Sequence, residues 1–260
     1  MEAYYNRGAA YYAKGDYDRA IADFTRALQL DPNNVGAYNN RGLTYHAKGD
    51  YDRAVADYSE AIRLDPEDAG AYNGRGTVYN DNGDYARAIA DYSEAIRLDP
   101  DDAAEMSKTY YNRGVAYSRQ EDYDRAIADY SEVIRLDPEN AVAAMAYNNR
   151  GYMYYSTGDY DRAIADYGEA LRLDPEDVFA YTNRGNAYDD QGDYDRAIAD
   201  YSDAIWIDPN LSTAYYNRGI VYYRKGDYRN ARADWEQVLR INPGHVNVRR
   251  NLEMLEQMGY

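Results

Sequence analysis

The sequence predicts an all-α solenoid, in which antiparallel helix pairs stack in a row and each pair buries its apolar side only against its neighbours. The first observation is an Arg-Gly dipeptide that recurs at residues 7–8, 41–42, 75–76, 113–114, 150–151, 184–185 and 218–219. The second is a closing proline, found at Pro32, Pro66, Pro100, Pro138, Pro175, Pro209 and Pro243. Successive prolines are 34, 34, 38, 37, 34 and 34 residues apart, a period typical of helical repeats.

Each repeat is predicted to contain two helices joined by a tight turn. One face of the first helix carries residues four and three apart, which in the second repeat are Tyr38, Gly42 and Tyr45. Gly49 suits the left-handed position after this helix, and Asp50 can cap the next helix by accepting amide hydrogens. Pro66 ends the second helix because it lacks an amide donor. Glu121 replaces the turn glycine in the fourth repeat, at a cost of about 1 kcal/mol if that position is left-handed.

The period divides residues 1–245 into seven repeats: 1–34, 35–68, 69–102, 107–140, 144–177, 178–211 and 212–245. The extra residues at the two longer spacings, 103–106 and 141–143, are good helix formers and amount to about one helical turn each. We therefore expect longer first helices in the fourth and fifth repeats. Residues 246–260 carry an apolar side, made of Val248, Leu252 and Leu255, and are predicted to form a C-terminal capping helix.

A family resemblance rests on the spacing of Tyr4, Gly8, Tyr11, Ala20, Phe24, Ala27 and Pro32. This spacing resembles the tetratricopeptide repeat, with tyrosine in place of the family's first tryptophan, and the match covers residues 1–245. The resemblance implies a right-handed superhelix whose first helices line a concave groove. Because this architecture hosts many different binders, the resemblance indicates the fold more strongly than the ligand.

One pair of positions departs from the family pattern in all seven repeats. The family commonly has leucine before the glycine and an apolar or aromatic residue just before the aromatic residue of the second helix. Here an arginine and an aspartate stand at these positions, from Arg7 with Asp23 to Arg218 with Asp234. We predict that each pair forms a structural salt bridge across the contact between the two helices.

Composition argues against several functional classes. A formal net charge of −17 and a pI near 4.5 disfavour binding to nucleic acid or to an anionic membrane. The chain has no cysteine, and His46 and His245 lack metal-ligand spacing. No phosphate-binding loop or nucleophile motif occurs, so we expect no enzymatic activity, cofactor or metal. The first residues lack the basic and apolar regions of a signal peptide, which favours a cytoplasmic location.

Tyrosine is unusually abundant, with 34 of 260 residues. Most tyrosines occupy repeated aromatic positions and are assigned to the core. The others lie at positions 5, 9 or 12 of a first helix, where the family exposes variable residues to its groove: Tyr5, Tyr12, Tyr111, Tyr152, Tyr155, Tyr216 and Tyr223. Because tyrosine offers a large contact area with few torsions to freeze, we predict that these seven form a recognition surface. The alternative is that some of them pack against the adjacent repeat.

Position 6 of the first helix is asparagine in six repeats: Asn6, Asn40, Asn112, Asn149, Asn183 and Asn217. Only Gly74 breaks the series. A primary amide both donates and accepts, so it can pair with a peptide backbone of any sequence. The series resembles the asparagine ladders with which some tetratricopeptide superhelices hold extended peptides. The alternative is that asparagine is simply common at this position.

These observations predict a scaffold that binds a protein or an extended peptide in its concave groove, with a neutral or basic partner favoured by the acidic charge. Binding of acidic chaperone tails is disfavoured, because positions 5 and 9 carry no lysine and Arg119 and Arg224 at position 13 are isolated. One alternative is a self-associating scaffold that stacks weakly through its uncapped N-terminal repeat. Another is a sequence close to a repeat consensus that has no natural ligand.

Overall fold

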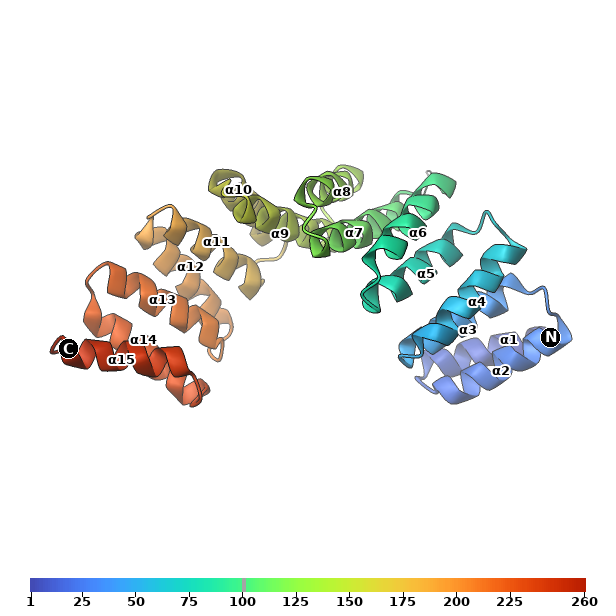
Figure 1. The fold of residues 1–260 in the computed structure, drawn as a ribbon, viewed down its shortest axis with the longest axis horizontal. Helices are drawn as coiled ribbons and strands as arrows, with labels where there is room; N and C mark the ends of the chain where they lie inside the picture. The colour runs from blue at the N-terminus through green and yellow to red at the C-terminus, as the bar shows by residue number, and fades with distance from the viewer. Residues whose placement is uncertain (100–101) are drawn as a thin grey trace. The chain divides into compact units, whose positions relative to one another are not determined.

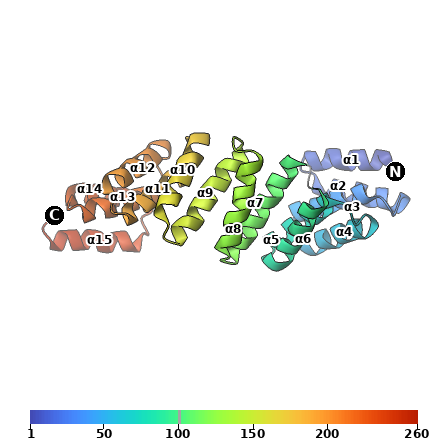
Figure 2. The same cartoon turned by 90° about the horizontal axis from the view of Figure 1, so that it is seen from above.

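The computed structural model describes residues 1–99 and 102–260. Over these two ranges the chain forms fifteen α-helices and no strand, which confirms the predicted all-α solenoid of helix pairs. The chain divides into two compact units, residues 1–137 (unit 1) and residues 138–260 (unit 2). Figures 1 and 2 show that, within each unit, helices follow one another as antiparallel pairs. None of the described helices combines the length and apolar composition needed to cross a bilayer.

Unit 1 contains four helix pairs, and each helix packs against the next one along the chain. Its helices are α1 (Glu2–Ala13), α2 (Tyr17–Leu30), α3 (Val35–Ala47), α4 (Tyr51–Leu64), α5 (Ala69–Asp81), α6 (Tyr85–Leu98), α7 (Ala103–Arg119) and α8 (Tyr123–Leu136).

Unit 2 contains three further pairs and a final single helix. Its helices are α9 (Ala141–Ser156), α10 (Tyr160–Leu173), α11 (Val178–Asp190), α12 (Tyr194–Ile207), α13 (Ser212–Arg224), α14 (Tyr228–Ile241) and α15 (Val246–Gln257). The first helices of the fourth and fifth repeats, α7 and α9, have 17 and 16 residues, whereas α3, α5, α11 and α13 have 13 each. The predicted lengthening is therefore confirmed.

The turn within each pair follows the predicted chemistry. Gly49 has φ +76°, and the Asp50 side chain caps α4 by accepting a hydrogen bond from the Arg53 amide at 3.3 Å. Glu121 has φ 60° and is the one left-handed residue other than glycine in the described part of the chain, as its place in the repeat predicts. The predicted closing proline Pro100 lies outside the described residues.

The recurring glycine of each first helix lies against the aromatic side chain of the second helix. A Cβ atom on Gly185 would stand 2.8 Å from ring carbon Cε1 of Tyr201, which is fully buried. Because real Cβ contacts are almost never shorter than 3.0 Å, a larger residue would force the two helices apart. The aromatic ring fills most of the space that the glycine leaves. The glycine also allows the backbones of the two helices to approach each other closely.

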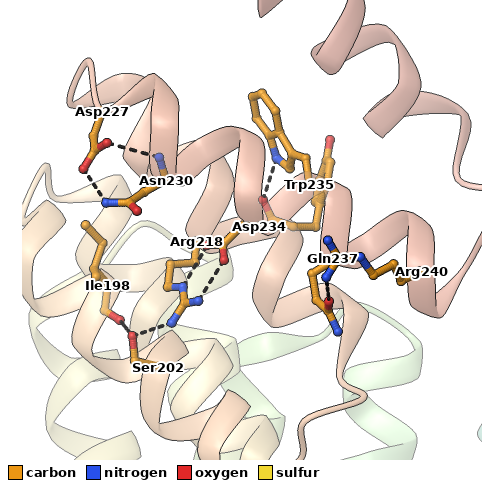
Figure 3. Close-up of polar contacts among 10 residues, drawn as sticks. Ile198, Ser202, Arg218, Asp227, Asn230, Asp234, Trp235, Gln237 and Arg240 are labelled. Carbon is orange, nitrogen blue, oxygen red and sulfur yellow. Dashed lines mark hydrogen bonds and ion pairs between the residues drawn. The ribbon is translucent and has the colours of Figure 1, made fainter. Parts of the chain in front are cut away.

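All seven predicted ion pairs form, with two hydrogen bonds in each. The Arg218 guanidinium donates to both carboxylate oxygens of Asp234 at 2.8 Å, and its third nitrogen donates to the Ser202 hydroxyl of the preceding repeat at 2.8 Å (Figure 3). The arginine thus links its own helix pair to the pair before it. Six of these arginine side chains are 17–22 % exposed, but Arg7 in the first repeat is 57 % exposed.

The helix α15 covers the end of unit 2, as predicted. Val248 and Leu255 are fully buried and belong to one apolar cluster with Trp235 and Val238 of α14. Arg249 and the other charged residues of α15 remain exposed, so the helix closes the apolar core with a polar surface.

Candidate functional site

The first helices of unit 2 surround a pocket of about 100 Å³. We call this the unit 2 pocket, and its lining residues are Tyr155 of α9, Asn186, Asp189 and Asp190 of α11, Tyr201 of α12, and Asn217, Ile220 and Arg224 of α13. The helical period explains the grouping, because residues three, four or seven apart lie on one face of a helix.

Two hydrogen bonds close one side of the pocket by joining successive first helices. The Tyr155 hydroxyl donates to Asp190 Oδ2 at 2.6 Å, which links α9 to α11. The Arg224 guanidinium donates to Asp189 Oδ2 at 2.5 Å, which links α13 to α11. Each bond therefore ties one repeat to the next, and the orientation of these side chains is set before any ligand arrives.

The floor of the pocket is held by a shared acceptor. Asn186 Oδ1 accepts hydrogen bonds from the Tyr201 hydroxyl at 2.7 Å and from the Asn217 amide at 3.0 Å. Tyr201 is fully buried against Gly185, so its hydroxyl is held in place by the packing of the core. The helix pair α11–α12 thereby positions an amide of the next repeat, α13.

The Asp189 carboxylate lies in an environment that disfavours negative charge. Burial raises the pKa of Asp189 above its usual value, and the hydrogen bond from Arg224 only partly opposes this effect. Asp189 Oδ1 is buried and accepts no hydrogen bond, although Oδ2 is paired. Burial, together with the hydrogen bond to Asp190, also raises the pKa of Tyr155. The phenol therefore stays protonated and continues to donate to Asp190.

Asn40, Asn183 and Asn217, three members of the predicted ladder, each donate a hydrogen bond to the preceding repeat. The Asn217 amide bonds Asn186, the Asn183 amide bonds Asn148 Oδ1 at 3.2 Å, and the Asn40 amide bonds the Tyr5 hydroxyl at 2.8 Å. The side chains of these three thus connect repeats in the free protein and keep their carbonyl oxygens as acceptors. Of the other three, Asn6 is exposed, and Asn112 and Asn149 are half-buried.

The seven predicted tyrosines have unequal exposure. Tyr152 is 49 % exposed, and its ring stacks on that of Tyr155 with centroids 6.4 Å apart, next to the unit 2 pocket. The remaining six are half-buried: Tyr5, Tyr12, Tyr111, Tyr155, Tyr216 and Tyr223.

Several of these half-buried tyrosines contact aromatic residues or the next repeat. Tyr12 and Tyr111 contact the rings of Tyr17 and Tyr130 in the second helices of their own repeats. Tyr216 contacts the His245 ring at 5.0 Å, and the Tyr223 hydroxyl approaches the sulfur of Met254 in α15. The alternative for these tyrosines is packing against the adjacent repeat. It applies to part of the set, such as Tyr223, which contacts the next helix α15.

Sequence reasoning missed Asn186, Asp189, Asp190 and Arg224 as members of a shared site. For the two carboxylates and the arginine, the sequence pattern that could have found them is a separation of 35 residues, one repeat plus one residue. This separation joins complementary side chains at position 12 of one repeat and position 13 of the next. The pair His46 and Asp81 in unit 1 has the same separation, and its Nε2 and Oδ2 atoms are 2.8 Å apart. Arg224, at position 13, is therefore not isolated, because it pairs with Asp189 at position 12 of the preceding repeat.

The described residues contain no cluster of three or more histidine, cysteine, aspartate or glutamate side chains placed to hold a metal ion. Family models for tetratricopeptide repeats match nearly the whole chain. The model described as TPR repeat matches residues 8–49, 151–192 and 185–226, and two models described as tetratricopeptide repeat match residues 39–103, 107–140 and 212–245. A search of the curated proteins finds no match.

Solved structures with the same fold include three that illustrate the range of similarity. The C-terminal part of a TPR repeat-containing protein from Cytophaga hutchinsonii is 19 % identical and covers 95 % of this chain and 99 % of its own, with a TM-score of 0.77. YrrB, described as a TPR protein with an unusual peptide-binding site, is 23 % identical over 75 % of this chain and 97 % of its own, with a TM-score of 0.62. MamA is 28 % identical over 65 % of this chain and 94 % of its own, with a TM-score of 0.60.

Proposed function

Because this chain belongs to the tetratricopeptide repeat family, we propose that it is a non-enzymatic scaffold that holds an extended protein segment against its first helices. The observation that carries this proposal is the unit 2 pocket, which collects side chains from three successive first helices. An extended segment that crosses these helices would contact all three repeats at once.

The chemistry around the pocket suits a peptide. The side chains of Asn183 and Asn217 use their amide nitrogens as donors, which leaves their side-chain carbonyl oxygens for backbone amides of a peptide, while Tyr152 offers an exposed ring to a side chain. YrrB, a structural relative, is described as having a peptide-binding site, which supports a peptide as the class of ligand. The net charge of −17 favours a neutral or basic segment through electrostatic complementarity.

The test begins with a displayed library of random linear peptides, selected on the full chain. Affinities of the selected peptides are then measured by fluorescence anisotropy for the natural sequence and for Tyr152→Ala. We expect a loss of about tenfold or more, because an exposed aromatic residue at a binding surface commonly contributes more than 1 kcal/mol.

The matched control is Trp206→Arg. Trp206 is 83 % exposed, does not line the unit 2 pocket and stands on α12 where other second helices carry an arginine such as Arg172, so this change restores the repeat pattern. We expect unchanged affinity. Selection of no peptide at all, or an equal loss for Trp206→Arg and Tyr152→Ala, contradicts groove binding.

The second candidate function is self-association through the first repeat. The observation that favours it is the exposure of Arg7 on α1, which is 57 % exposed, whereas the six equivalent arginines are 17–22 % exposed. Sedimentation velocity over a range of concentrations tests this candidate. Growing oligomers that disappear in Ala10→Glu, which places a charge on the exposed side of α1, support assembly, and a concentration-independent monomer excludes it.

A further inference from the structure

We propose that the unit 2 pocket is a binding site for a basic side chain, the guanidinium of arginine or the ammonium of lysine, carried by the segment that the first helices hold. This inference rests on the proposed function, which it makes specific. A basic residue of the bound segment would then lie at this pocket, which would fix the position of the segment along the groove.

The charge balance of the pocket favours a cation. Asp189 and Asp190 supply two carboxylates, and Arg224 is the one basic residue in the lining. Asp189 Oδ1 is itself buried and has no donor in the described chain, so the acceptor within reach of a ligand is the exposed Asp190, whose one hydrogen bond found there comes from Tyr155 to Oδ2. The pocket thus has more acceptor capacity than its own donors use, which a charged donor can satisfy with strong hydrogen bonds.

The helix directions add to this negative potential. The helices α9, α11 and α13 end at Ser156, Asp190 and Arg224, so the pocket lies beside three helix C-termini. The C-terminal end of a helix carries partial negative charge and attracts cations. Asp189 and Asp190 are the last two residues of α11, so their negative charges lie at the negative end of the helix dipole. A positively charged partner would relieve this repulsion. Burial also raises the pKa of Asp189, and an added cation would favour its ionised form.

The rest of the lining fits the stem of a long basic side chain. Ile220 supplies an apolar wall, and Tyr155, whose ring stacks on that of Tyr152 outside the lining, supplies an aromatic one. Methylene groups of lysine and arginine pack on apolar surfaces, and their charged ends interact favourably with aromatic faces. A volume of about 100 Å³ accommodates such a head group, whereas a whole peptide has to remain outside.

An acidic ligand fits the same pocket less well. Arg224 is the cation that could receive a carboxylate, but it already donates to Asp189 at 2.5 Å. A ligand carboxylate there would also face Asp190, whose one hydrogen bond found in the described chain comes from the uncharged Tyr155. The charge and the hydrogen bonds of the pocket therefore favour a basic ligand over an acidic one.

The experiment uses small probes, so that it does not depend on knowing the natural ligand. The ¹⁵N-labelled full chain is titrated with N-acetyl-arginine methylamide, with its neutral analogue N-acetyl-citrulline methylamide, and with N-acetyl-glutamate methylamide. We expect saturable amide shifts at residues 155, 190 and 224 with the arginine probe, and at least about tenfold weaker binding of the other two.

Three variants assign the effect to the pocket. Asp190→Asn keeps an acceptor for Tyr155 and should weaken the arginine probe about tenfold, whereas Asp203→Asn, an equal charge change on the exposed side of α12, should leave it unchanged. Arg224→Gln removes a competing cation and should maintain or strengthen binding. Equal binding of arginine and citrulline probes, or tighter binding of the glutamate probe that Arg224→Gln abolishes, overturns the inference.

The outcomes separate this inference from the proposed function. Selected peptides that bind without a basic preference, together with an arginine probe that does not bind, leave the scaffold role intact and remove the basic-side-chain site. An arginine probe that binds, together with a library that yields no peptide, keeps the basic site and contradicts the scaffold role.

Discussion

Two equivalent tyrosines, Tyr58 in unit 1 and Tyr201 in unit 2, pack in different directions. A Cβ atom on Gly74 of the following repeat would lie 2.5 Å from the Tyr58 ring, and the nearest ring atom to a Cβ on its own Gly42 would be 3.2 Å away. Tyr201 instead lies against its own Gly185, where the corresponding distance is 2.8 Å. The side chain of Tyr58 therefore leans toward the next repeat.

The neighbours of the two rings explain the difference. The hydroxyl of Tyr201 donates to Asn186, which also accepts from Asn217. Near Tyr58 these two asparagines are replaced by Leu43 and Gly74, so the hydroxyl has no amide partner and the ring fills the place of a missing side chain. One fold thus accommodates two inner surfaces, and the difference accompanies position 6 of the following repeat, where Gly74 replaces the usual asparagine.

The largest expected difference is between the ion pair of the first repeat and that of an inner repeat. Asp200→Ala leaves Arg184, which is 22 % exposed, without its carboxylate, and we expect a loss of about 3–5 kcal/mol in unfolding free energy. Asp23→Ala leaves Arg7, which is 57 % exposed and readily solvated, and we expect a loss of about 1 kcal/mol. Chemical denaturation of both variants measures the contrast. The double change Asp200→Ala/Arg184→Leu should recover part of the loss, and additive losses would contradict the pairing.

The second prediction concerns two substitutions that make the surroundings of Tyr58 in unit 1 resemble those of Tyr201 in unit 2. Gly74→Asn places a Cβ atom within 2.5 Å of the Tyr58 ring and should destabilise the chain by about 1–3 kcal/mol. Adding Leu43→Asn offers the Tyr58 hydroxyl the partner that Tyr201 has in Asn186, so the double variant should be more stable than Gly74→Asn alone. Thermal melting compares the natural chain, the two single variants and the double variant. A double variant less stable than the sum of the two single changes would show that other contacts hold Tyr58 in place.

A third prediction compares the turns of the two units. Glu121 before α8 has φ 60°, whereas the equivalent Gly158 before α10 has φ +81°. Glu121→Gly should stabilise the chain by about 1 kcal/mol, because glycine adopts a left-handed conformation without a steric penalty. Gly158→Glu should cost a similar amount. Equal melting temperatures for the natural chain and both variants would contradict the strain assigned to this turn.

The smallest effect concerns the link between neighbouring repeats. Arg41, Arg75, Arg113 and Arg218 each donate to a serine or threonine of the preceding repeat. The residue that would serve Arg184 is Gly168, where a Cβ atom would lie 3.9 Å from Arg184 Nη1 and near nothing else.

The unfolding free energy of Gly168→Ser should therefore be about 0.5–1.5 kcal/mol higher than that of Gly168→Ala. Both changes remove the low helix propensity of glycine, and only serine supplies an acceptor for Arg184. Denaturation of the two variants measures this difference directly. Equal stability of the two would mean that water already satisfies the third nitrogen of Arg184.

Much of the fold follows from the sequence because its signals act over short distances. Proline ends a helix, glycine permits the turn, and aspartate caps the next helix within a few residues, and seven repetitions make each signal unambiguous. The paired departure of arginine and aspartate also predicted a contact within one repeat, which all seven pairs confirm. The extra residues before α7 and α9 predicted longer helices for the same local reason.

Only the tertiary structure decided how side chains of successive first helices meet. The pairing of Tyr155 with Asp190, the sharing of Asn186 by Tyr201 and Asn217, and the lean of Tyr58 toward Gly74 each depend on contacts between repeats. Such contacts are set by the rotation and spacing of one helix pair on the next and by the volume of every side chain between them. A repeat pattern specifies that the pairs stack, but the fit of individual side chains at each junction determines which groups remain free for a ligand.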